Sequence, residues 1–156
     1  MNMPNVRAWI GVGANLGEPK SQVSNAIEHL NNLESVKVEK ISSLYQTEPI
    51  GKRNQPDFIN AVARVSTKLE PLSMLHHMLE IESNFGRVRD GSQNSPRRLD
   101  LDLLIYGELV MNSAELILPH PRMKDRLFVL EPLRELEGNF DIPAFGCVSR
   151  LISKCS

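Results

Sequence analysis

The stretch SPRRLDLDLLIYG, Ser95–Gly107, carries acidic side chains into an apolar run. Its alternation of leucine with aspartate predicts a strand over Arg98–Tyr106 whose leucines point into the core. Asp100 and Asp102 then share the opposite face, with their Cα atoms about 6.6 Å apart at a rise of ~3.3 Å per residue. The stretch therefore predicts a buried strand that carries a pair of carboxylates.

Two carboxylates at this separation repel each other by about 2–3 kcal/mol at an effective dielectric constant near 20. A cation between them would offset that repulsion, and magnesium is typically held by a few carboxylates together with substrate phosphates. The alternative is a solvated strand face with arginine counter-ions. Both interpretations fit Asp100 and Asp102 taken alone.

Several arginines stand close to these aspartates in the sequence. Arg87 and Arg89 lie in GRVRDG, and Arg97 and Arg98 directly precede the acidic strand. The guanidinium fork matches phosphate oxygens in a bidentate way, although each arginine alone could equally be a surface charge. Carboxylates for a metal combined with arginines for phosphates favour a phosphoryl-type transfer.

Working outward from this strand, hydrophobic periodicity predicts the elements that precede it. The expected strands are Arg7–Asn15, Val36–Thr47 with a bulge near Ile41 and Ser42, and Phe58–Thr67; the expected helices begin near Pro19 and Pro71. The inner stripe of the second helix is expected to contain Leu72, Leu75, Leu79 and Phe85.

This order of elements is the ferredoxin-like βαββαβ core of an α+β fold. It predicts an antiparallel-rich sheet with helices packed on one face. A hairpin over Gly107–Leu118 and a helix over Leu127–Leu136 are added at the C-terminal side.

The length and composition set broad limits on partners and location. A chain of 156 residues predicts a single domain, 1–156. A formal net charge of -1 argues against nucleic acid or an anionic membrane as the partner. No signal peptide and no apolar run near ~20 residues is present. We expect a cytoplasmic monomer in which Cys147 and Cys155 are reduced thiols.

The remaining candidates each have two interpretations. Gly11, Gly13 and Gly17 miss the dinucleotide fingerprint, because Leu16 stands where its third glycine belongs, and they are interpreted as a turn that needs positive φ. The phosphate-binding loop motif ending in GK[ST] is also absent.

His120, which is flanked by two prolines, could bond a phosphate or fill a turn. Phe58 and Phe128 could stack on a flat ligand or belong to the core. Asn60 shares the face of Phe58 and could read the polar edge of a heterocycle.

The chain as a whole is similar to a known family over about Trp9 to Leu136. The matching motifs, in order, are GANLG, YQTEPIG, QPDFINAV, GRVR, PRRLDLDLLIYG and PHPRMKDRLFVLEPL. They resemble the 6-hydroxymethyl-7,8-dihydropterin pyrophosphokinase family of folate biosynthesis. The resemblance implies transfer of pyrophosphate from ATP to the hydroxymethyl group of the dihydropterin, with release of AMP.

The resemblance also implies a role for particular residues. Two magnesium ions would be bound by Asp100 and Asp102. The phosphates of ATP would be contacted by Arg87, Arg89, Arg97, His120 and Arg126, with Glu82 beside the nucleotide. The catalytic set would be Arg87, Arg89, Arg97, Asp100 and Asp102. The pterin would be held by Phe58 and Phe128 as stacking rings, by Asn60, and by the backbone of Thr47 and Ile50.

Some features depart from the family pattern, and other functions stay open from the residues alone. Asp90, Asn94 and Pro121 replace residues that some members carry as a basic residue, tryptophan and tyrosine. The loop Gly86–Pro96 is nevertheless expected to close as a lid.

An RNA-binding module on the same fold and a metal-dependent nuclease or nucleotidyl hydrolase are the alternative functions. The low aromatic content, 5%, weighs against the former.

Overall fold

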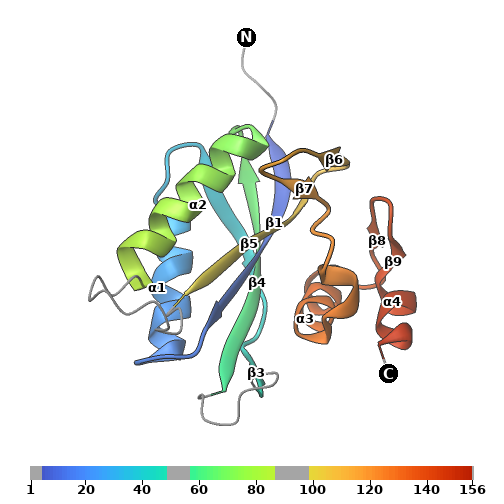
Figure 1. Cartoon of the computed structure of the whole chain (residues 1–156), viewed down its shortest axis with the longest axis horizontal. Helices are drawn as coiled ribbons and strands as arrows, with labels where there is room; N and C mark the ends of the chain where they lie inside the picture. The colour runs from blue at the N-terminus through green and yellow to red at the C-terminus, as the bar shows by residue number, and fades with distance from the viewer. Residues whose placement is uncertain (1–4, 49–56, 87–98, 156) are drawn as a thin grey trace.

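The structure is a computed structural model that describes residues 5–48, 57–86 and 99–155. Within these ranges the chain forms a five-stranded antiparallel sheet in the order β2-β4-β1-β5, with the short β3 also paired to β4 (Figure 1). The strands are β1 Val6–Ala14, β2 Val36–Ile41, β3 Tyr45–Thr47, β4 Phe58–Thr67 and β5 Asp100–Tyr106. This order confirms the ferredoxin-like α+β fold.

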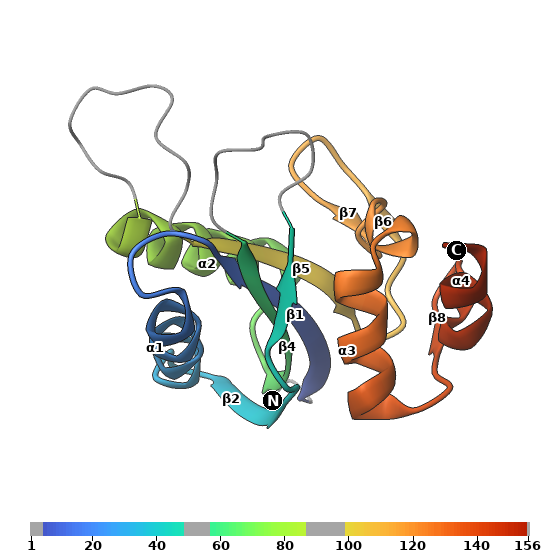
Figure 2. The same cartoon turned by 90° about the horizontal axis from the view of Figure 1, so that it is seen from below.

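Helices cover both faces of the sheet, as Figures 1 and 2 show. The helices α1 Pro19–Asn31 and α2 Pro71–Gly86 lie on one side, and α3 Leu127–Glu137 and α4 Val148–Lys154 lie on the other. The expectation that the helices of the βαββαβ core pack on one face is therefore confirmed for α1 and α2, and the added helix α3 covers the opposite face. Within the described ranges, every helix is too short or too polar to cross a bilayer.

Small elements complete the C-terminal part of the fold. The predicted hairpin is formed by β6 Met111–Asn112 and β7 Ile117–Leu118. A 3₁₀ turn η1 Met123–Asp125 leads into α3, and a second hairpin, β8 Asp141–Ile142 with β9 Gly146–Cys147, leads into α4.

Two hydrophobic cores result, one on each face of the sheet. Along β1, Ile10 and Val12 point to the α1 and α2 side, whereas Trp9 packs with α3 and α4 on the other side. This division follows from the alternation of side chains along a strand. Beyond Trp9, the α3 side of β1 carries Gly11 and Gly13, so no β1 side chain fills that part of the face.

The predicted strand Val36–Thr47 is interrupted where its alternation fails. β2 ends at Ile41, and β3 begins at Tyr45. Between them, the Ser42 hydroxyl accepts a hydrogen bond from the Val62 N–H at 2.9 Å and donates one to the Ser43 carbonyl at 2.8 Å. The pairing of β2 with β4 shifts its register between Val38 and Lys40, and the predicted strand then breaks after Ile41, where the buried hydroxyl keeps the chain attached to β4.

One predicted core residue of α2 is exposed. The Leu79 side chain points outward with 47% of its surface accessible, whereas Met74, Met78 and Ile81 are buried. Their spacing of i, i+4 and i+7 is a regular inner stripe. The helix has apolar residues on more than one stripe, so periodicity alone did not select the correct one.

The C-terminal end of α3 is fixed to the sheet by a buried ion pair. Arg64 of β4, with 10% of its side chain exposed, lies 2.9 Å from the carboxylate of Glu137. The Trp9 indole N–H donates to the same carboxylate at 3.1 Å. Because both sheet partners sit deep under α3, this contact determines where the helix ends on the sheet.

A paired substitution tests the observed orientation of α2. Met78→Ala should lower the free energy of unfolding by about 2–5 kcal/mol, because it leaves a cavity in the core. Leu79→Ala, the matched control, should lower it by about 1 kcal/mol or less, because that side chain is half exposed. Urea denaturation measures both values. Equal losses in the two variants would contradict the orientation.

Candidate active site

A hollow lies over the glycines of β1. The strand register places Gly13 between Asp100 of β5 and Asn60 of β4, and it places Gly11 opposite Asp102. Because glycine has no side chain, these positions leave a cavity of about 400 Å³ between the flanking groups. The backbone at Gly11 and Gly13 does not have positive φ, so the turn interpretation is right only for Gly17, at φ 65°.

Two aromatic side chains line this cavity from different elements. Phe58 is the first residue of β4, and Phe128 lies in the first turn of α3. Both are half-buried, and the Arg126 guanidinium lies 5.6 Å from the centroid of the Phe128 ring. Rings that are only partly covered by the protein leave aromatic surface available for a flat ligand.

The amide of Asn60 presents an acceptor to the cavity. Its Nδ2 donates to the Thr47 hydroxyl at 3.0 Å, and only 8% of the residue is exposed. A methyl group added at Gly13 would stand 2.7 Å from Asn60 Oδ1, so this oxygen lies directly above the glycine floor. With Nδ2 bonded to Thr47, Oδ1 is the amide atom that faces the cavity.

Basic groups approach the carboxylate of Asp102. Nε2 of His120 and Nη1 of Arg126 each lie 3.8 Å from one of its oxygens. The Arg122 N–H donates to His120 Nδ1 at 3.2 Å, so the ring proton resides on Nε2 and faces Asp102. Burial lowers the pKa of His120; the Asp102 charge opposes this shift, and Arg126 and Arg122 add to it.

A second cavity, of about 270 Å³, opens on the other side of Asp102. Its lining includes Leu75 of α2, His120, and the turn of the hairpin between β6 and β7 at 113–116. Asp102 lines both cavities, so a ligand in one can meet a ligand in the other at this carboxylate.

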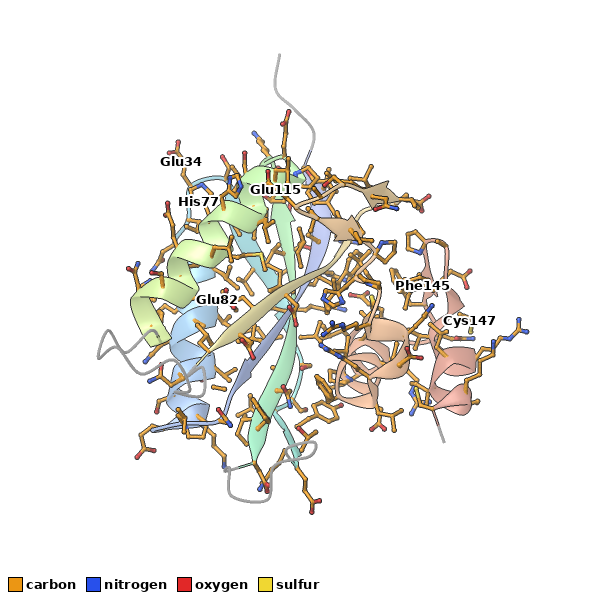
Figure 3. The ribbon with its side chains drawn as sticks, viewed as in Figure 1. Glu34, His77, Glu82, Glu115, Phe145 and Cys147 are labelled. Carbon is orange, nitrogen blue, oxygen red and sulfur yellow. The ribbon has the colours of Figure 1, made fainter. Side chains whose placement is uncertain are left out.

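Glu82 lines neither cavity. It lies on α2 beside β5 (Figure 3), where its Oε2 accepts a hydrogen bond from the Leu101 N–H at 2.8 Å. The observed contact holds α2 to the start of β5 next to the two aspartates. Its predicted role beside a nucleotide remains a prediction.

The structure brings most of the predicted site residues together. Thr47, Phe58, Asn60, Asp100, Asp102, Arg126 and Phe128 line the first cavity, and His120 lines the second. The predicted residues Ile50, Arg87, Arg89 and Arg97 lie outside the described residues. The floor formed by Gly11 and Gly13 and the hairpin turn were missed, although the GVG motif was a usable signal for the floor.

Paired carboxylates with basic groups beside them are typical of enzymes that transfer phosphate groups. Comparison with known proteins then narrows the class. Residues 9–138 match the family described as 7,8-dihydro-6-hydroxymethylpterin-pyrophosphokinase (HPPK).

Two bacterial relatives match nearly the whole chain. Over 149 residues it is 37% identical to the 2-amino-4-hydroxy-6-hydroxymethyldihydropteridine pyrophosphokinase of Pseudomonas aeruginosa, with 96% of this chain and 91% of that protein covered. The enzyme of the same name from Haemophilus influenzae is 35% identical over 149 residues, with 96% and 92% covered.

A solved structure, Plasmodium falciparum HPPK-DHPS with pteroate, matches with a TM-score of 0.75. Its sequence identity is 15%, and the match covers 96% of this chain and 42% of that chain, so it supports the fold. The family match and the bacterial relatives go further: the chain belongs to the HPPK family. It is an ATP-dependent pyrophosphokinase of folate biosynthesis.

The charge environment of His120 can be tested in the protein without ligands. The Asp102 carboxylate stabilises the imidazolium form, so Asp102→Asn should lower the pKa of His120 further below 6.5. Titration of the histidine ring protons by NMR measures the shift, with Asp141→Asn as a distant control. A His120 pKa that rises in Asp102→Asn would contradict the described arrangement.

Proposed function

We propose that the two cavities hold the two substrates of the pyrophosphokinase reaction, with the transferred group passing beside Asp102. In this reaction the hydroxymethyl oxygen of 6-hydroxymethyl-7,8-dihydropterin bonds to the β-phosphorus of ATP. The bond from that phosphorus to the oxygen of the α-phosphate breaks, and AMP leaves. The observation that supports this assignment is the carboxylate that the two cavities share.

The dihydropterin is assigned to the cavity over the glycine floor. A flat bicyclic ring can stack against Phe58 and Phe128, which both line this cavity. Asn60 Oδ1 would accept a hydrogen bond from an N–H group on the edge of the ring, because this oxygen lies over the glycine floor while Nδ2 points to Thr47. The backbone of Thr47 and Ile50 would bond the same edge.

ATP is assigned to the second cavity. The apolar Leu75 and the hairpin turn offer a surface for the base, while His120 and Arg126 extend toward the first cavity. With its proton on Nε2, His120 can donate to a phosphate oxygen. Arg87, Arg89 and Arg97 are proposed to contact the triphosphate, and Glu82 to lie beside the nucleotide.

The aspartate pair fits magnesium only in combination with phosphate. Among residues 5–48, 57–86 and 99–155, no three His, Cys, Asp or Glu side chains form a cluster that could hold a metal alone. Asp100 and Asp102 supply two carboxylates on one strand face, and phosphate oxygens would complete a magnesium shell. Two magnesium ions bound there would stabilise the negative charge that develops during transfer.

The protein's own groups would position the reaction. The glycine floor and the rings hold the pterin so that its hydroxymethyl group points along β5 toward the shared carboxylate. The basic groups near Asp102 stabilise the phosphate oxygens. Asp100, which shares a sheet row with Gly13 and Asn60, is the carboxylate assigned to take the hydroxyl proton.

We further infer that the chain 1–156 acts as one domain and as a cytoplasmic monomer. Cys147 and Cys155 are both free, which agrees with reduced thiols. The absence of strong net charge agrees with small-molecule substrates.

The shared carboxylate provides the main test. Asp102→Asn should reduce AMP formation by about a hundredfold or more, because it removes the negative charge proposed to bind magnesium where the phosphate group is transferred. The binding of pterin should change much less. Asp141→Asn is the matched control on an exposed carboxylate. AMP formation is measured with and without pterin, and near-normal formation by Asp102→Asn would contradict the assignment.

The glycine floor provides a second test. Gly13→Ala should weaken pterin binding by about tenfold, since the new methyl group displaces the Asn60 amide that Thr47 holds in place. Gly11→Ala should weaken binding by a smaller factor, because its methyl group narrows the floor but meets Leu104 at an ordinary 3.5 Å and leaves Asn60 in place. Calorimetry of pterin binding, with a non-hydrolysable ATP analogue and magnesium present, distinguishes the two.

A further inference from the structure

One carboxylate outside the cavity connects its two sides. Glu135, on α3, accepts hydrogen bonds from the Ser43 N–H at 2.9 Å, from the Ser43 hydroxyl at 2.9 Å and from the Tyr45 hydroxyl at 2.7 Å. The Ser43 N–H also reaches the other oxygen, at 3.1 Å. Neither Glu135 nor its partners line either cavity.

These contacts join the elements that carry the two walls of the pterin cavity. On α3, Phe128 precedes Glu135 by seven residues, which is two helical turns, so both lie on one face of the helix. On the other side, β3 runs from Tyr45 to Thr47 and pairs with β4, so that Thr47 lies opposite Phe58. Each end of the contact therefore leads directly to a cavity wall.

Other contacts act on this spacing as well, because α3 packs on the sheet through Leu130 and Leu133, which are fully buried. β3 has three residues, and β4 is its only strand partner in the described sheet. The buried contact between Glu137 and Arg64 joins the same end of α3 to β4, not to β3. The Glu135 contact links α3 to Tyr45 of β3 and to Ser43 just before that strand.

We propose that Glu135, with Ser43 and Tyr45, is a positioning group that sets the width of the pterin cavity. The proposal rests on the assignment of the pterin to that cavity. A carboxylate that binds three donors at once restricts the sliding of α3 along β3 more than a single neutral hydrogen bond would. A correctly spaced cavity then binds the flat ring without first having to rearrange.

The protonation of the two side chains is consistent with this role. Glu135 is an exposed residue. Its small loss of hydration raises its pKa, but the hydrogen bonds from Tyr45 and Ser43 lower the pKa by more, so the net shift is downward. Burial, the hydrogen bond from Tyr45 to Glu135 and the charges of Glu135 and Glu131 raise the pKa of Tyr45 to about 12, against the opposing charge of Arg134. At neutral pH the contact is thus between a carboxylate and a neutral phenol.

The test separates pterin binding from general stability. Glu135→Ala should raise the Kd of the pterin about tenfold, while the Kd of a non-hydrolysable ATP analogue changes less than about twofold. Glu135→Gln keeps an oxygen acceptor for Ser43, so it should restore much of the binding. Tyr45→Phe should weaken pterin binding by a smaller factor and have almost no further effect when added to Glu135→Ala. Calorimetry and thermal unfolding are measured for each variant.

Glu39→Gln is the matched control, because Glu39 also joins separate elements, by contacts with Arg7 and Arg64 at 3.1 Å, away from the cavity. It should leave the pterin Kd unchanged. If Glu135→Ala lowered the melting temperature without changing the pterin Kd, or weakened both ligands equally, the positioning role would be overturned. Phe128→Ala distinguishes a failure of the cavity assignment from a failure of the Glu135 inference. If Phe128→Ala binds pterin normally, both the cavity assignment and the inference are overturned. If Phe128→Ala loses pterin binding while Glu135→Ala keeps it, only the inference is overturned.

Discussion

The register of β1 between β4 and β5 is the constraint on which the site depends. In an antiparallel sheet, a residue on the central strand determines what lies between its neighbours on both sides. At position 13 that residue is glycine, with Asp100 on one side and Asn60 on the other. A carboxylate and an amide therefore face each other across an open floor, without any loop having to bring them together.

The same strand builds a core on its other face. Ile10 and Val12 are buried under α1 and α2, with at most 2% of their surface exposed. Side chains alternate along a strand, so the missing side chains at Gly11 and Gly13 leave space only on the α3 side of the sheet. The core under α1 and α2 stays complete. The hollow can thus exist in the middle of a stable sheet, and α3 covers only part of it, because Leu130 and Leu133 pack in the core while Phe128 reaches the cavity.

The sequence predicted those features that depend on local periodicity or on motif resemblance. Alternation was sufficient for β4 and for the leucine face of β5, and resemblance identified Phe58 and Phe128. Periodicity was insufficient for α2, where Leu79 and Met78 are equally apolar and only packing separates them. Periodicity also did not indicate which face of the sheet α3 covers, since the face depends on the path of the chain from β5 to α3. The role of Gly13 was misread because a glycine acts here by the space it leaves. Glu135 resembles any solvated charge on a helix until its partners on β3 are seen.

The charges around Asp102 explain why one place can accept ligands of both signs. At 3.8 Å, His120 and Arg126 attract the carboxylate but are too distant for good hydrogen bonds, so their donors keep their capacity for another oxygen. Their attraction is also screened, because 41% of the Asp102 side chain is exposed. Asp100, two residues earlier, adds a second negative charge on the same face. The carboxylates thus keep an attraction for cations while the adjacent basic groups keep one for anions. Under the proposed function, a polyphosphate that arrives with its own divalent ions would satisfy both at once.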